Sequence, residues 1–162
     1  MVKVNRKEAE PMKEGYVDNR FASLYYKEMG QGMPLIMLHG NGESHEIFAR
    51  LSELMSRYYR VILMDSRGHG SSLMKEEAAG GDLTIPDMAA DVVQVMEFLH
   101  VPRAVILGFS DGANVALETA SCYPGRVSAV VAVSGNALPR GMSAASLMEV
   151  KFCLLYTSPS PR

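Results

Sequence analysis

The sequence predicts an α/β fold with a doubly wound, mostly parallel sheet, and three observations lead to this prediction. Short apolar runs of strand length alternate with segments of helical periodicity along the 162-residue chain. The turns between them are rich in glycine and polar residues. Each apolar run ends directly at such a polar segment. Because the carboxyl ends of parallel strands meet at one edge of a sheet, we expect these segments to form a single functional rim.

Four apolar runs are the predicted buried strands, since strands covered on both faces are apolar throughout. Ser44 and Thr84 have the residue type and position of helix N-caps, and Asp87 completes a capping box with Thr84. A third helix is expected from Ala113 to just before Pro124. A hairpin is expected within 16–29, and an exposed connection over 73–83. The predicted buried strands are residues 34–38, 60–64, 101–107 and 127–133.

Composition indicates one ordinary globular domain, with 48% hydrophobic residues and a formal net charge of −2. This charge gives no basic surface for nucleic acid, and no apolar stretch has the length of a membrane span. We therefore expect neither a nucleic-acid partner nor a membrane partner. The first residues lack the apolar core of a secretory signal, so we expect a cytoplasmic protein. Cys122 and Cys153 form no metal-binding or disulfide pattern, and no metal or other cofactor is expected. The sequence carries no indication of the oligomeric state.

The segment Gly-Phe-Ser-Asp-Gly at residues 108–112 lies between a predicted strand and a predicted helix. A serine at so sharp a turn is held in a strained conformation that exposes its hydroxyl, and Gly108 and Gly112 leave room for the close packing. The alternative is an ordinary glycine-rich turn. We interpret the segment as the nucleophile elbow of a serine hydrolase, with Ser110 as the nucleophile.

A serine nucleophile also needs hydrogen-bond donors for the oxyanion that forms when it attacks a carbonyl group. The backbone N–H groups of Asn41 and Asp111 follow two of the predicted strands and are the candidate donors. His39, Gly40 and Gly42 would shape the supporting loop. The alternative for residues 39–42 is a tight turn that only leaves the strand.

Three segments in this order resemble the α/β-hydrolase superfamily of serine hydrolases: 39–42 (HGNG), 65–72 (DSRGHGSS) and 108–112 (GFSDG). The resemblance covers about residues 16–150. It implies attack on an ester, thioester or similar small-molecule carbonyl substrate through an acyl-enzyme. The resemblance assigns residues 65–72 a structural role beside the pocket.

In that family the triad acid and histidine follow the serine in the chain, whereas all four histidines here precede Ser110. We therefore expect an incomplete fragment that is itself inactive. A rescue in which His69 activates Ser110 with Asp65 behind it is conceivable. His39 is expected to brace the supporting loop of residues 39–42. His45 and His100 are expected to lie on the surface near helix ends.

Two further alternatives stay open for the function. Hydrolysis of a carbon–carbon bond beside a carbonyl, or acyl transfer to an acceptor other than water, uses the same elbow. A non-catalytic ligand-binding protein with the hydrolase fold belongs to a different class.

The chain divides into four predicted parts. Residues 1–14 form a polar arm, residues 15–139 form the first part of the hydrolase core, and residues 140–152 are interpreted as the start of a lid. The last ten residues, 153–162, resemble a translated sequencing adapter and are predicted to be a non-native tail. On this interpretation the native sequence is interrupted near residue 152.

Overall fold

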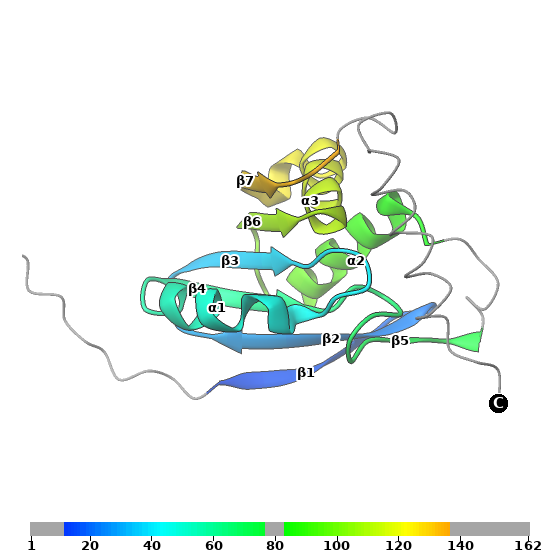
Figure 1. The fold of residues 1–162 in the computed structure, drawn as a ribbon, viewed down its shortest axis with the longest axis horizontal. Helices are drawn as coiled ribbons and strands as arrows, with labels where there is room; N and C mark the ends of the chain where they lie inside the picture. The colour runs from blue at the N-terminus through cyan, green and yellow to red at the C-terminus, as the bar shows by residue number, and fades with distance from the viewer. Residues whose placement is uncertain (1–11, 77–82, 137–162) are drawn as a thin grey trace, which may run out of the picture.

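The structure is a computed structural model that describes residues 12–76 and 83–136. A mixed sheet forms its centre, and helices lie on both faces (Figure 1). The strands are β1 (Lys13–Asp18), β2 (Ala22–Met29), β3 (Met33–Leu38), β4 (Tyr59–Met64), β5 (Leu73–Met74), β6 (Ala104–Phe109) and β7 (Val127–Val133). The helices are η1 (His45–Phe48), α1 (Ala49–Met55), α2 (Ile85–Phe98), α3 (Asp111–Cys122) and η3 (Pro124–Arg126).

The strand order is β1-β2-β4-β3-β6-β7, with β5 paired to β2. The pairs β4–β3, β3–β6 and β6–β7 are parallel, whereas β1, β2 and β5 are antiparallel to their neighbours. The four predicted strands and their parallel pairing are therefore confirmed, but the burial predicted for residues 127–133 is wrong, since most of β7 is exposed. The doubly wound order places the ends of β3 and β6 side by side. In this position the loop after β3 meets the turn after β6.

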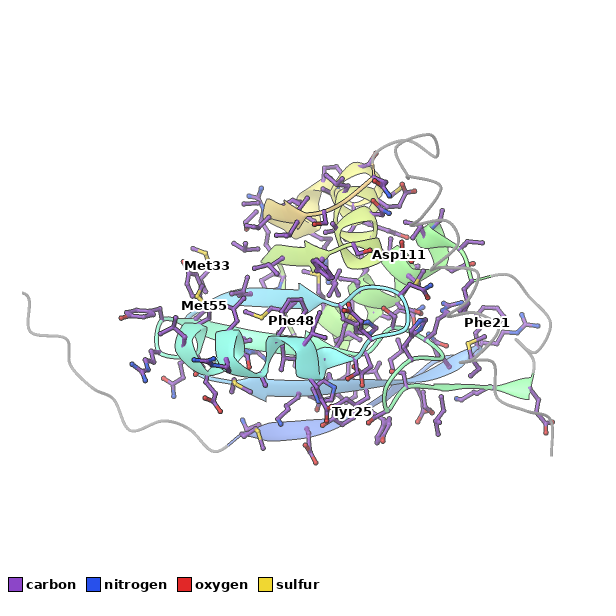
Figure 2. All side chains as sticks on the ribbon, in the orientation of Figure 1. Phe21, Tyr25, Met33, Phe48, Met55 and Asp111 are labelled. Carbon is purple, nitrogen blue, oxygen red and sulfur yellow. The ribbon has the colours of Figure 1, made fainter. Side chains whose placement is uncertain are left out.

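Each face of the sheet has its own apolar core. Ile36, Ile62 and Ile106 pack against α2 and α3, which lie together on one face. On the other face Met37 and its neighbours pack under Phe48, which lies between the sheet and the start of α1 (Figures 1 and 2). The alternating residues of the central strands thus serve two cores, which explains their continuous apolar sequence.

The N-terminal half differs from the sequence prediction at two places. Strand β1 begins at Lys13, two residues inside the predicted polar arm. The predicted exposed connection over 73–83 contains the short strand β5, which pairs with Ala22 and Ser23 of β2. Both strands are held by backbone pairing more than by burial, so they leave little apolar pattern. The lid prediction (140–152) and the tail prediction (153–162) lie outside the described residues.

A buried ion pair fixes the loop after β4 to helix α2. The Arg67 guanidinium donates to both carboxylate oxygens of Asp91, with Nε–Oδ2 at 2.6 Å and Nη2–Oδ1 at 2.7 Å. Asn19, in the turn between β1 and β2, donates to the same carboxylate at 2.9 Å. Burial raises the pKa of the Asp91 carboxyl above its ordinary value, while the Arg67 bonds act in the opposite direction. Three separate segments are therefore joined at one carboxylate.

Removal of this carboxylate should destabilise the chain strongly. Asp91→Ala leaves the Arg67 guanidinium buried without its partner, and we expect a loss of about 3–5 kcal/mol in the free energy of unfolding. Urea denaturation followed by circular dichroism measures the loss. Asp18→Ala, at the exposed pair with Lys75, is the control and should change little. Equal effects of the two substitutions would contradict the assignment.

Strand β7 is the last strand of the described sheet and is poorly covered. Val131 and Val133 are 46% and 43% exposed. Their side chains share a face of the strand, while the backbone edge away from β6 has no partner strand within the described residues. An exposed apolar edge of this kind pairs readily with other chains.

The 162-residue chain should therefore self-associate through β7. Val131→Lys places a charge on the exposed face and should shift the chain toward monomer in size-exclusion chromatography with light scattering. Met33→Lys is the control, because Met33 is even more exposed than Val131 but begins the central strand β3. A clean monomer of the unmodified chain at all concentrations would refute the prediction.

Candidate active site

Ser110 occupies the sharp turn between β6 and α3. Its backbone has φ 52° and ψ −117°, a region that non-glycine residues rarely adopt. The Ser110 N–H donates to the Val133 carbonyl at 2.9 Å, and its carbonyl accepts from Ala113 at 2.9 Å. The Ser110 hydroxyl has no hydrogen-bond partner among residues 12–76 and 83–136. The structure thus contains the strained serine that the sequence predicts, held from both sides.

The two glycines of the turn are required by close packing. A Cβ on Gly108 would lie 2.1 Å from the carbonyl oxygen of Gly112. A Cβ on Gly112 would lie 2.1 Å from the carbonyl oxygen of Leu38 and 2.6 Å from that of His39. Neither position has room for a side chain. The first turn of α3 therefore rests directly on the end of β3.

The loop after β3 passes beside the serine. A Cβ on Gly40 would lie 3.1 Å from the Cβ of Ser110, so Gly40 borders the turn. Glu43 accepts the Gly40 N–H through Oε2 at 2.9 Å. Within the part of the chain that the structure describes, the N–H groups of Asn41 and Asp111 have no acceptor. The donors that sequence reasoning proposed are thus unpaired, and the loop bends back through Gly42 at φ 72°.

His39 is buried and braces this loop. Its Nδ1 donates to the Gly40 carbonyl at 2.7 Å, and its Nε2 accepts from the Ser66 N–H at 3.0 Å. Since one nitrogen donates and the other accepts, the ring is neutral. Burial lowers the pKa of His39 below its ordinary value of 6.5. Both nitrogens are occupied, so His39 cannot act as a base toward Ser110.

The other histidines near the rim also have partners. His69 Nδ1 lies 3.1 Å from the Arg67 carbonyl oxygen, and its Nε2 lies 3.1 Å from the Asn41 side-chain oxygen Oδ1. Asp65 pairs with His45 and not with His69. The conceivable rescue with His69, Asp65 and Ser110 is therefore wrong in this structure, because each of the first two groups is bonded elsewhere.

The surface position expected for His45 is also wrong. Its side chain is only 13% exposed, because it turns inward to the buried carboxylate of Asp65. His100, at the end of α2, is exposed as expected. The sequence offered no signal for the His45 contact, since 20 residues separate the partners and no local pattern links them.

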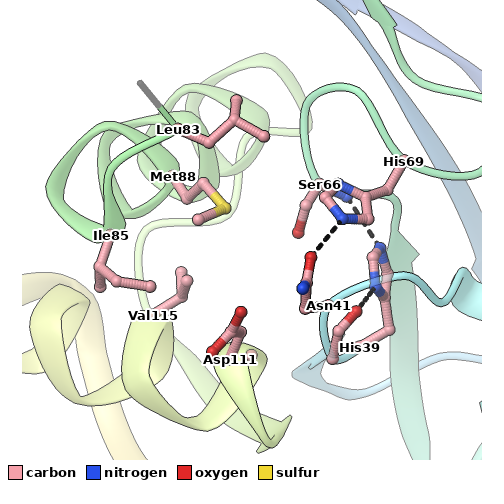
Figure 3. A pocket seen from close by; sticks show the side chains of 11 residues that line it. His39, Asn41, Ser66, His69, Leu83, Ile85, Met88, Asp111 and Val115 are labelled. Carbon is pink, nitrogen blue, oxygen red and sulfur yellow. Dashed lines mark hydrogen bonds between the residues drawn. The ribbon is translucent and has the colours of Figure 1, made fainter. Parts of the chain in front are cut away.

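A cavity of about 220 Å³ opens beside the turn (Figure 3). One wall is polar and contains Asn41, His69 and Ser66, and Asp111 lies at the start of α3. The opposite wall is apolar and comes from the start of α2 and from α3. Ser110 itself is not a lining residue, although Gly40, Asp111 and Gly112 beside it are. The apolar lining residues, which sequence reasoning missed as site residues, are Leu83, Ile85, Met88 and Val115.

The apolar residues escaped detection because Ile85 and Met88 belong to a helical stripe that also serves the core. Ile85 and Met88 reach the cavity because the first turn of α2 lies at the rim. In the described part of the chain, no group of three or more His, Cys, Asp or Glu side chains is arranged to hold a metal ion.

Comparison with known proteins identifies the family. The model of the alpha/beta hydrolase fold matches residues 33–151. The chain belongs to this family. It is 34% identical over 104 residues to the AB hydrolase superfamily protein YisY of Bacillus subtilis, covering 64% of this chain and 37% of that protein. It is 30% identical over 128 residues to the proline iminopeptidase of a serogroup A strain of Neisseria meningitidis, covering 75% and 40%.

A solved structure agrees with the fold. Est816, described as an N-acyl homoserine lactone degrading enzyme, superposes with a TM-score of 0.73 at 30% identity, covering 85% of this chain and 52% of that chain. The chain thus spans about two fifths to one half of the length of these relatives. Within the described residues, no helix is both long and apolar enough to cross a membrane.

The neutral, buried His39 gives the stability a defined pH dependence. Because its pKa is lowered on folding, the unfolded chain takes up the proton first, and stability falls as the pH drops below about 6.5, by at most about 1.4 kcal/mol per pH unit. His39→Gln should lose this component. Urea midpoints at pH 7.5, 6.5 and 5.5 test the prediction, since the advantage of the unmodified chain over His39→Gln should shrink toward acid. Parallel curves would contradict it.

Proposed function

We propose that this chain is the N-terminal part of a cytoplasmic serine hydrolase that attacks a small-molecule ester, thioester or similar carbonyl substrate and forms an acyl-enzyme. The observation that carries the proposal is the turn at Ser110. Among residues 12–76 and 83–136, the strained Ser110 has an unbonded hydroxyl, and the backbone N–H groups of Asp111 next to it and of Asn41 in the adjoining loop have no acceptor. A nucleophile and an oxyanion site are required together for acyl transfer.

The attack would proceed in two steps. The Ser110 Oγ bonds to the substrate carbonyl carbon while a base takes its proton, and the carbonyl oxygen becomes an oxyanion. The N–H groups of Asn41 and Asp111, the latter at the helix N-terminus, donate to that oxyanion. Collapse expels the leaving group with a proton and leaves the acyl-serine, which water then hydrolyses. The 220 Å³ cavity beside the turn, with its apolar wall, would receive part of the substrate.

The base is not among the described histidines. His39 and His69 use both ring nitrogens. His45 holds Asp65 through Nδ1, but it does not line the cavity and does not bond to Ser110 within the described residues. His100 is exposed at the far end of α2. We infer that the acid and histidine belong to sequence beyond this chain. The names of two relatives, a proline iminopeptidase and a lactone-degrading enzyme, both denote substrates with a carbonyl group.

The test begins with the source DNA. Sequencing beyond the codon for Phe152 should reveal an open frame with an acidic residue and then a histidine, each after a predicted strand. The protein encoded by the complete frame should release p-nitrophenol from short p-nitrophenyl esters with a burst, and a fluorophosphonate probe should label it. Ser110→Ala should abolish labelling and lower kcat at least about 1,000-fold.

Ser134→Ala is the matched control, because Ser134 also lies on the rim with a positive φ of 55°. It should keep labelling and turnover. The 162-residue chain should itself turn over poorly, since without a base only oxyanion stabilisation and binding remain. A frame that closes near residue 162, or turnover independent of Ser110, would refute the proposed function. Binding without turnover by the complete protein would support the ligand-binding alternative.

A further inference from the structure

The loop of residues 39–45, here called the oxyanion loop, is anchored at both ends to the loop after β4. At its start, His39 accepts from the Ser66 N–H. At its end, the His45 backbone N–H donates to Asp65 Oδ1 at 2.6 Å. We propose that Asp65 and His45 are positioning residues, which hold the Asn41 N–H where the oxyanion forms. This inference rests on the proposed function of Ser110.

The Asp65 carboxylate is fully buried, with 0% exposure, and is bound from two loops. His45 Nδ1 lies 3.0 Å from each of its oxygens, in addition to the backbone bond. The Ser71 N–H donates to Oδ2 at 2.8 Å. A buried carboxylate needs such partners, because removal from water costs several kcal/mol when they are absent. The burial of the Asp65 carboxylate therefore requires its contact with His45.

The surroundings leave neither partner free to move. A Cβ on Gly70 would lie 2.3 Å from Asp65 Oδ2, so the backbone of the β4 loop closes over the carboxylate. On the other side, the Tyr25 ring packs against the His45 ring with centroids 5.0 Å apart. The end of the oxyanion loop is thus held in one position relative to the sheet.

Internal bonds then determine which N–H group of the loop is available. Glu43 takes the Gly40 N–H, and the Glu43 N–H donates back to the Gly40 carbonyl at 3.4 Å. Asn41, between them, keeps its N–H unpaired within the described residues. Because Gly40 borders Ser110, a shift of the His45 end would be passed through this short loop to the Asn41 N–H. A displacement of about 1 Å at a reacting centre lowers a rate by about 100-fold.

Asp65 and His45 do not serve as the catalytic base. Within the described residues, neither Asp65 nor His45 bonds to Ser110, and Asp65 already accepts three N–H groups. Its effect on the reaction must pass through the loop. The expected signature is therefore a loss in kcat with little change in KM, because the oxyanion donor acts in the transition state and not on the ground-state substrate.

The kinetic test uses the protein encoded by the complete frame. Asp65→Asn and His45→Leu should each lower kcat by about 10- to 100-fold, with KM within about threefold. His45→Asn keeps a donor at the place of Nδ1 and should restore kcat to within about fivefold of the unmodified enzyme. Asp91→Asn is the matched control, because it weakens the other buried carboxylate anchor of the β4 loop but does not touch the oxyanion loop.

Asp91→Asn should lower the melting temperature as Asp65→Asn does, while its kcat stays within about threefold at temperatures well below unfolding. If Asp65→Asn and Asp91→Asn reduce kcat equally, or if His45→Asn gives no rescue, the two residues are only structural and the inference is wrong. Loss of all Ser110-dependent turnover in the unmodified protein would instead refute the proposed function.

A second measurement tests the anchoring without turnover. In the 162-residue chain, the hydrogen-bonded amide protons of Gly40 and His45 should exchange at least about tenfold faster in Asp65→Asn than in the unmodified chain. Amides of β6, such as that of Ile106, should exchange at the same rate in both. Unchanged exchange at Gly40 would overturn the inference whatever the kinetics show.

Discussion

The site depends on the close contact between the first turn of α3 and the end of β3. Gly112 lies against the carbonyl oxygens of Leu38 and His39 with no space for a side chain. This contact brings the loop after β3 beside Ser110, although the two segments are about seventy residues apart in the sequence. Because β3 and β6 are neighbours in the sheet, the contact needs no rearrangement of either strand. The strained φ at Ser110 is the cost of so short a connection, and bonds to Val133 and Ala113 maintain it.

Polar bonds from the loop after β4 to its neighbours, rather than apolar packing, give the rim its rigidity. The links from His39 to Ser66, from His45 to Asp65 and from Arg67 to Asp91 all involve residues of the loop after β4. Loops carry backbone groups that strands and helices do not satisfy, so buried side chains with several donors or acceptors serve them. The loop after β4 is therefore a scaffold on which the oxyanion loop rests, while catalysis itself is assigned to other segments.

The sequence predicted the parts of the fold that depend on local pattern. Continuous apolar runs identified β3 and β4 closely, because strands covered on both faces leave such runs. The run of β7 gave its bounds as well, although most of that strand is exposed among the described residues. The cap at Thr84 was equally readable, since its hydroxyl accepts from Asp87 three residues later. Two segments that resemble the family, GxSxG at residues 108–112 and HGNG at residues 39–42, predicted the turn at Ser110 and the loop beside it. The elbow was predictable because its backbone geometry demands glycine on both sides of the serine.

What escaped prediction depends on contacts between distant residues. The start of β1 at Lys13 and the strand β5 are fixed by pairing with β2, and neither has an apolar alternation of its own. His45 looked like a surface residue because nothing near it in the sequence reveals the carboxylate of Asp65. The apolar wall of the cavity escaped for another reason. Met88 fits the core stripe of α2, and only the three-dimensional position of that helix brings it to the cavity.

The described residues separate the two halves of the proposed chemistry. The proposed nucleophile and the proposed oxyanion donors come from loops that follow adjacent strands, and their geometry is held by contacts inside this part of the chain. The base is not among the described rim histidines, because His39 and His69 use both ring nitrogens and His45 does not bond to Ser110 within the described residues. Electrostatic stabilisation of an oxyanion needs donors fixed in advance, whereas proton transfer needs a base that reaches the hydroxyl. Under the proposed function, these residues therefore supply the groups that bind the carbonyl oxygen, whereas turnover also needs a base that they do not supply.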